Sequence, residues 1–279
     1  METSYPTLAG ETIILRPADV IFVRYHGEHG NWWREHLHRI ITWIPGTPGK
    51  RHAGYAHVAG VGPMADPSLI ISAELRGVRC LPLQTWETDD YSLMICRPPV
   101  MPEQRNSGWA GPEFDQAFDR SIEAARIAMR RRVADALQAQ VGIPYGRFGV
   151  AAQGLDMLLS FGGRLWSKRP ISWVVSRLER ASYCSEAVAI AFWSGWEFKF
   201  RRWDKLRSVL NCHIVQPKDM EWTAALLEWE VVYRTSHGTP APLEHDGWIT
   251  NRIKLLKVRH GEKALVSTAD DVGGPVVAG

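Results

Sequence analysis

Hydrophobic residues in the first third of the chain fall into short runs divided by turn residues. Residues 19–24 form an apolar, β-branched run that predicts a buried strand. Three further runs, over residues 56–62, 69–75 and 91–96, are separated by proline, glycine and paired aspartates. Strands divided in this way predict an antiparallel meander.

Later in the chain the apolar spacing becomes that of helices. Apolar residues recur every three or four positions from Phe114 to Val141, which predicts one long helix that begins near Glu113. A Trp- and His-rich helical pattern covers residues 31–44, and two shorter helical pieces fall within 150–181. Residues 1–18 predict irregular structure. From Ser236 onward the composition is polar and predicts an extension rather than a core element.

Strands followed by helices in this order predict an α+β fold. The chain of 279 residues, 45% of them hydrophobic and 13 of them Trp, can bury a sizeable core. A net charge of +3, from 33 basic and 30 acidic residues, is too balanced for a dedicated nucleic-acid-binding protein. No apolar run of about 18 residues predicts a transmembrane helix. The N-terminus lacks the features of a signal peptide, so we expect synthesis in the cytoplasm.

One of the four cysteines occupies a position that favours reactivity. Residues 182–196 predict an amphipathic helix with Ser182 as its N-cap, Gly195 near its end and Cys184 in its first turn. Its core-facing positions are Ala187, Val188, Ala191 and Phe192. The positive end of the helix dipole and unpaired N–H groups lower the pKa of a thiol placed there. Position alone is also typical of a small buried hydrophobe, since free cysteines are usually buried and inert. The other three cysteines have no metal-binding or disulfide spacing, and we expect all four to be free thiols.

A reactive thiolate needs a base and a group that orients the base. His57 lies on one predicted strand and Glu74 on the next. Adjacent strands can place an imidazole and a carboxylate within hydrogen-bonding reach. Taken one at a time, these residues are also consistent with a structural histidine and a solvated glutamate.

The order of these pieces resembles the circularly permuted branch of the NlpC-type papain-fold cysteine hydrolases, in which the histidine strand precedes the cysteine helix. The resemblance covers roughly residues 18–221. The matching stretches are Asp19-Val-Ile-Phe-Val, His57-Val-Ala-Gly-Val-Gly, Ile71-Ser-Ala-Glu74-Leu-Arg-Gly77-Val78, Ile143-Pro-Tyr145, Tyr183-Cys184-Ser185-Glu186 and Gln216-Pro217-Lys-Asp219-Met. The chain departs from the family where Ala18 precedes Asp19 in place of the usual glycine.

The resemblance implies a permuted papain-like fold in which an antiparallel half-barrel sheet packs against helices. It implies Cys184 as the nucleophile, His57 as the general base and acid, and Glu74 as the orienting residue. The backbone N–H of Cys184 would contribute to an oxyanion hole. Three further residues would serve the oxyanion or the substrate: Tyr183, Tyr145 and Asp19. No metal and no cofactor is implied.

The domain boundaries follow from this resemblance. We expect a hydrolase domain over residues 1–235, with inserts at 25–50 and 97–142, and a polar C-terminal extension over 236–279. An extension too polar to fold alone predicts packing against other protein chains. Tryptophans expected near the surface, namely Trp32, Trp109, Trp222 and Trp248, are also typical of an interface or a carbohydrate-facing groove. A phage tail tip or baseplate, and hence a virion, would be such an assembly.

Three functions stay open at this point. The first is a cysteine peptidase or amidase that hydrolyses peptidoglycan stem peptides, the substrate class that the resemblance implies. The second is an amidase or acyltransferase acting on lipid amides or esters, because the permuted branch includes such enzymes. The third is a catalytically idle structural subunit.

A zinc site is the chemical alternative to the thiol. Six histidines fall within residues 26–57, at His26, His29, His36, His38, His52 and His57. No His-Glu-x-x-His sequence is present, and His36 and His38 cannot share one helical face. We therefore expect no metal site.

Overall fold

The structure is a computed structural model of the chain. It describes residues 3–7, 10, 12–26, 55, 57–63, 70–74, 76–99, 112–145, 184–201, 210, 212 and 215–260. The predicted helices over 31–44 and 150–181 lie outside these residues, as do Ser182 and Tyr183.

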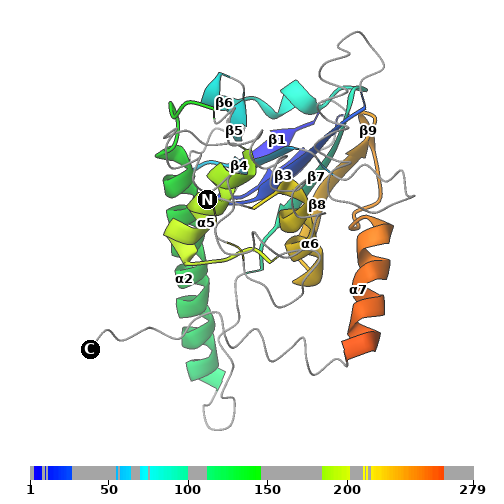
Figure 1. The fold of residues 1–279 in the computed structure, drawn as a ribbon. Helices are drawn as coiled ribbons and strands as arrows, with labels where there is room; N and C mark the ends of the chain where they lie inside the picture. Colours follow the sequence, from blue (N-terminus) through cyan, green and yellow to red (C-terminus); the bar gives the residue numbers. More distant parts are fainter. Residues whose placement is uncertain are drawn as a thin grey trace, which may run out of the picture.

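A seven-stranded antiparallel sheet forms the centre of the described part (Figure 1). Its strands run in the order β6-β5-β4-β3-β7-β8-β9. Their bounds are β3 (Val20–Tyr25), β4 (His57–Val61), β5 (Ile70–Glu74), β6 (Gly77–Leu81), β7 (Tyr91–Arg97), β8 (Glu230–Ser236) and β9 (Thr239–Pro240). Two short strands, β1 (Thr3–Pro6) and β2 (Thr12–Leu15), pair in a second antiparallel sheet. The α+β class predicted from the sequence is confirmed.

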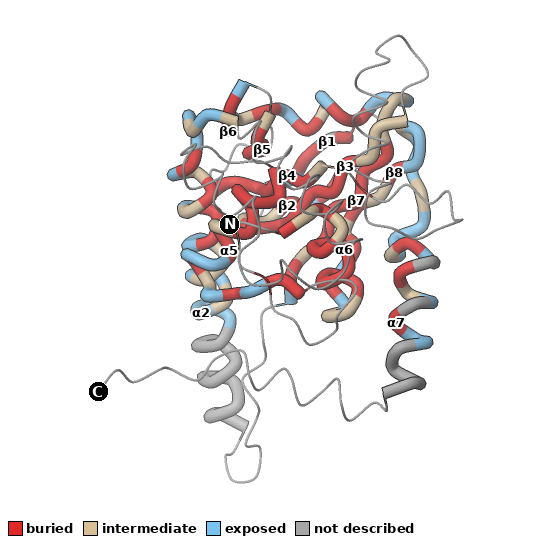
Figure 2. The backbone as a smooth tube through the Cα atoms, viewed as in Figure 1, coloured by how far each residue is buried: buried red, intermediate tan, exposed pale blue. Residues whose placement is uncertain are grey.

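The sheet is covered on both faces, which explains why β3 is apolar at successive positions. Val20 and Phe22 point to a core shared with three helices, α2 (Pro112–Gln138), α5 (Cys184–Trp196) and α6 (Pro217–Leu226). Ile21 and Val23 point to a second core, formed with the β1–β2 pair and a 3₁₀ turn, η1 (Leu83–Trp86). Figure 2 shows the central strands as the most continuously buried part of the chain.

Helix α5 packs against α2, β4 and β5, and it does so through the face that the sequence predicted. Ala187, Val188, Ala191 and Phe192 are all buried. Gly195 lies where α5 crosses α2, because a Cβ there would meet the backbone nitrogen of Val133 at 2.5 Å. The tight approach of these two helices fixes the position of α5 relative to the sheet.

Several expectations about the order of elements were wrong. Residues 1–18 contain β1 and β2, and the strands over 56–62, 69–75 and 91–96 do not form a simple meander. Strand β3 lies between β4 and β7, and its apolar side chains on both sides suit a central strand that is covered on both faces.

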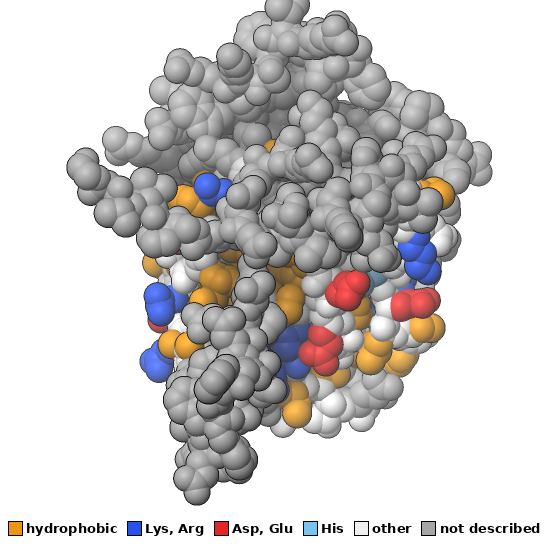
Figure 3. Space-filling view, turned by 90° about the horizontal axis from the view of Figure 1, so that it is seen from below, with side chains coloured by type: hydrophobic (Ala, Val, Ile, Leu, Met, Phe, Trp, Pro, Cys, Tyr) orange, Lys and Arg blue, Asp and Glu red, His pale blue; other side chains and the backbone are white. Residues whose placement is uncertain are grey.

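The stretch from Ser236 is not only a polar extension. It includes β9 and helix α7 (Gly247–His260), which packs Ile249 and Ile253 against Trp222 of α6. Trp222 is therefore fully buried rather than near the surface. In the part of the chain that the structure describes, no helix has the length and apolar character needed to cross a membrane. Figure 3 shows basic and acidic side chains interspersed with hydrophobic ones on one face of the described residues.

Candidate active site

Cys184 is the first residue of α5, and its thiol lies at the end of this helix that faces β4. The residue is 8% exposed. Backbone N–H groups of Val58 and Ser185 donate hydrogen bonds to the sulfur. Ser185 is buried behind it and donates its own hydroxyl to the carbonyl oxygen of Val215 at 2.7 Å, which ties the start of α5 to the residues that precede α6. The helix therefore presents the sulfur to the first residue of β4.

His57 opens β4 and lies within hydrogen-bonding reach of the Cys184 thiol. Burial alone would lower the pKa of His57, but the negative charges of Cys184 and Glu74, and hydrogen bonds to both, raise it to about 10. Burial alone would raise the pKa of Cys184, but the charge and hydrogen bond of His57 and the two backbone N–H groups lower it. These opposite shifts favour a thiolate–imidazolium pair.

Glu74 ends β5 and lies opposite His57 when the register Ala59↔Ser72 is continued by two residues. Its Oε1 is 3.4 Å from Nε2 of His57. Although burial opposes it, the hydrogen bond and charge of His57 lower the pKa of Glu74. The structure thus brings together Cys184, His57 and Glu74, the three residues to which the resemblance gives the catalytic roles.

Ser72 is the residue of this cluster that the sequence analysis missed. Its Oγ lies 2.7 Å from Nε2 of His57, and its hydroxyl donates to Oε1 of Glu74 at 3.0 Å. A serine inside an apolar strand gives no pattern that marks it as functional. Only the alternation of side chains along β5, which puts residues 72 and 74 on one face, could have suggested it.

Tyr145 also lies near the thiol, as the resemblance implied. Its ring packs against the core that contains Cys184. Burial, followed by the charges of Cys184 and Glu74, raises the pKa of Tyr145, so the phenol keeps its proton and can donate a hydrogen bond. Two backbone bonds hold this segment against β6, from Val78 N to Ile143 O and from Gly142 N to Val78 O, each 2.8 Å.

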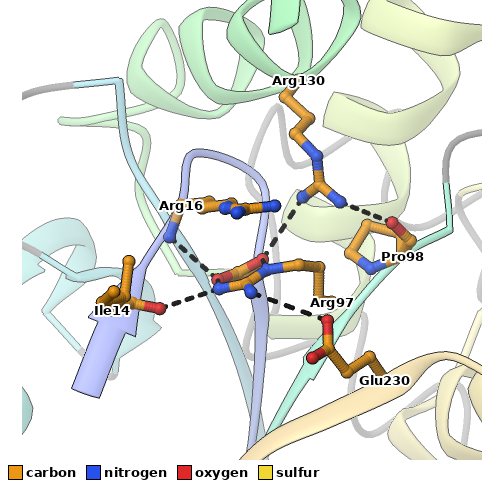
Figure 4. A network of polar contacts seen from close by, with 7 residues as sticks. Ile14, Arg16, Arg97, Pro98, Arg130 and Glu230 are labelled. Carbon is orange, nitrogen blue, oxygen red and sulfur yellow. Dashed lines mark hydrogen bonds and ion pairs between the residues drawn. The ribbon is translucent and has the colours of Figure 1, made fainter. Parts of the chain in front are cut away.

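Asp19 does not belong to this cluster. It precedes β3 at the end away from Val23, the residue that pairs with His57, and the four residue steps from Asp19 to Val23 span roughly 13 Å of strand. The side chain is fully buried and holds the main-chain nitrogen of Arg16, the guanidinium of Arg97 and that of Arg130 (Figure 4). Asp19 is therefore a structural ion-pair centre that joins β3, β7 and α2. The expectation that it serves the oxyanion or the substrate was wrong.

The remaining expectations about site residues concern metal ligands and Tyr183. Among the described residues, no group of three or more His, Cys, Asp or Glu side chains could hold a metal ion. Four of the six N-terminal histidines, His29, His36, His38 and His52, lie outside those residues, and so does Tyr183. None of the four cysteines forms a disulfide.

Comparison of the chain with models of protein families, with curated proteins and with solved structures finds no match. The chemistry of the cluster around Cys184 is therefore the observation that bears on function.

Proposed function

We propose that this protein is a thiol-dependent amide hydrolase with Cys184 as its nucleophile. The observation that carries the proposal is the arrangement of Cys184, His57 and Glu74. A thiol at a helix N-terminus is hydrogen-bonded to an imidazole, and Nε2 of that imidazole lies near a hydroxyl and a carboxylate. A nucleophile, a base and an orienting acid in contact are the parts that covalent acyl transfer requires.

The reaction follows from the protonation states. The Cys184 thiolate attacks the carbonyl carbon of the amide, and the new C–S bond gives a tetrahedral oxyanion. The backbone N–H of Cys184 and the hydroxyl of Tyr145 are the donors proposed for that oxyanion. Protonated His57 then gives its proton to the leaving nitrogen, the C–N bond breaks and the amine departs.

Hydrolysis of the thioester reverses these roles. Neutral His57 accepts a proton from water as the water oxygen attacks the thioester carbon. The C–S bond breaks, the carboxylic acid leaves, and the thiolate–imidazolium pair is restored. Each cycle consumes one amide bond and one water.

We further propose that the α+β fold is the permuted papain-like one and that the substrate is a peptide of peptidoglycan. The supporting arrangement is that α5, which carries Cys184, packs on β4 and β5, which carry His57 and Glu74. The substrate class rests on the resemblance in sequence order.

Release of peptides from purified sacculi tests nucleophile and substrate together. We expect the wild-type protein to release soluble peptides with new amino groups, Cys184→Ala to release none, and Cys80→Ala to match the wild type. If sacculi stay intact while N-acyl lipids are hydrolysed in a Cys184-dependent way, the peptidoglycan proposal is wrong. If Cys184→Ala equals the wild type on both substrates, the nucleophile is wrong.

A further inference from the structure

Ser72 lies between His57, the proposed base, and Glu74, the residue proposed to orient it. It lies on β5, is 1% exposed, and pairs with Ala59 across the sheet. Because side chains alternate along a strand, Ser72 and Glu74 share one face of β5, and His57 shares that face on β4. The small Ala59 opposite leaves the serine hydroxyl as the polar group next to the imidazole.

The three distances decide which contact links imidazole and carboxylate. Nε2 of His57 is 2.7 Å from Oγ of Ser72, and that Oγ is 3.0 Å from Oε1 of Glu74. The direct separation from Nε2 to Oε1 is 3.4 Å. Good N–H···O bonds span about 2.7–3.2 Å, so the path through the hydroxyl is the better one.

The direction of this path follows from donor and acceptor capacity. An ionised carboxylate only accepts, so the single hydroxyl proton of Ser72 goes to Glu74. The oxygen of Ser72 is then left to accept, and it accepts from an N–H at Nε2 of His57. With Nε2 occupied by this bond, Nδ1 is the ring nitrogen left to exchange a proton with Cys184, to which His57 is also hydrogen-bonded.

From this geometry we infer that Ser72 is a positioning residue through which Glu74 acts on His57, an inference that rests on the proposed function. The hydroxyl keeps a proton on Nε2 and holds the ring so that Nδ1 faces the sulfur. When His57 becomes positively charged, Glu74 polarises the hydroxyl toward it, and the charge is stabilised across two hydrogen bonds rather than one direct ion pair.

The test measures the rate of Cys184 alkylation by iodoacetamide against pH, which needs no substrate. Ser72→Ala should move the acid limb of the profile to higher pH and slow alkylation at neutral pH roughly three- to tenfold, the size of one lost hydrogen bond. Ser72→Thr, which keeps a hydroxyl, should restore most of the rate. The matched control is Ser92→Ala, because Ser92 is another buried serine whose Oγ contacts a histidine Nε2, that of His26, at 2.6 Å outside the site.

A double variant separates a relay from two independent contacts. If Glu74 acts through Ser72, Ser72→Ala combined with Glu74→Gln should alkylate no more slowly than the slower single variant. Effects that multiply in the double variant, or a Ser72→Ala profile that superimposes on the wild type, would overturn the inference and leave the proposed function standing. A wild-type Cys184 that alkylates only as an ordinary thiol would overturn both.

A second measurement needs no substitution at position 72, so it tests the inference even if Ser72→Ala does not fold. In Cys184→Ala, the neutral form of His57 should carry its proton on Nε2, as read from the ¹⁵N shifts of the ring. A neutral ring protonated on Nδ1 would contradict the proposed path.

Discussion

Nε2 of His57 lies 3.4 Å from Oε1 of Glu74, across two strands that the sequence places next to each other. The pair is only partly shielded, because the side chains are 18% and 30% exposed. The carboxylate nevertheless lies close enough to favour the imidazolium form, which the proposed reaction uses as its acid.

Glu74→Gln should slow amide hydrolysis without unfolding the protein. The glutamine amide keeps the shape but removes the negative charge that raises the pKa of His57. We expect kcat/KM to fall about 10- to 100-fold, within the range that positioned proton transfer supplies. The control is Glu123→Gln, at an exposed glutamate of α2 that contacts Arg126 at 3.5 Å, and it should leave the rate unchanged. An unaltered rate in Glu74→Gln would show that the carboxylate has no part in the reaction.

Asp19→Asn should destabilise the fold and leave the thiol chemistry of the remaining folded protein intact. The substitution leaves the guanidiniums of Arg97 and Arg130, both nearly buried, without their charged partner. We expect the free energy of unfolding to fall by about 3–5 kcal/mol in urea denaturation. Glu230→Gln is the matched control, because Glu230 contacts the same Arg97 at 3.6 Å but is 66% exposed, and it should cost less than about 1 kcal/mol. An equal loss of unfolding free energy in the two variants would contradict the assignment of Asp19 as a buried ion-pair centre.

Gly195→Ala should push α5 away from α2. The added Cβ would lie 2.5 Å from the nitrogen of Val133 and 2.6 Å from its Cα, and neither backbone atom can turn aside. A loss of about 1–3 kcal/mol or more is expected in thermal or urea unfolding. Gly247→Ala, at the first residue of α7, meets nothing within 4 Å and should change stability by less than about 1 kcal/mol. A Gly195→Ala protein as stable as the wild type would contradict the close helix contact.

Glu221→Gln should stabilise the protein at neutral and alkaline pH. Glu221 is fully buried, and burial, followed by the charge of Asp246, raises its pKa to about 8. The folded state therefore holds a proton that the unfolded state has lost above its ordinary pKa of 4.5, so Glu221 costs stability as pH rises from 4.5 to 8. Glutamine carries no such cost, and the gain should reach roughly 2–5 kcal/mol above pH 8 and vanish near pH 4. A stability difference that does not change with pH would contradict the buried acid.

Local pattern predicted the elements that bury either a recurring apolar face or a continuous apolar run. The face of α5 is an example of the first, and the strands around residues 19–24, 56–62 and 69–75 are examples of the second. Strands β1 and β2 have only four residues each, and Ile14 of β2 is 46% exposed, so their pattern is too short to stand out. Helix α7 depends on Ile249 and Ile253 packing against a distant tryptophan.

The site residues likewise divide into those that the sequence predicted and those that depend on contacts with distant residues. The resemblance in the order of His57, Glu74 and Cys184 along the chain is what grouped them, since each residue taken alone is also consistent with a structural role. The role of Asp19 could not be read from its position before a strand, because its partners Arg97 and Arg130 are 78 and 111 residues away. Ser72 depends on the pairing of β4 with β5, which no local pattern records.

The pH titration of the Cys184 thiolate, followed as the difference in ultraviolet absorbance between the wild type and Cys184→Ser, tests the proposed nucleophile most directly. We predict that the thiolate forms below the ordinary thiol pKa of 9.0, because His57 and the N–H groups of Val58 and Ser185 outweigh burial. In His57→Gln the titration should move to or above 9.0, since burial then acts with less opposition. A wild-type thiol that titrates at or above 9.0, or a titration unchanged in His57→Gln, would contradict the proposal that His57 activates Cys184 as a nucleophile.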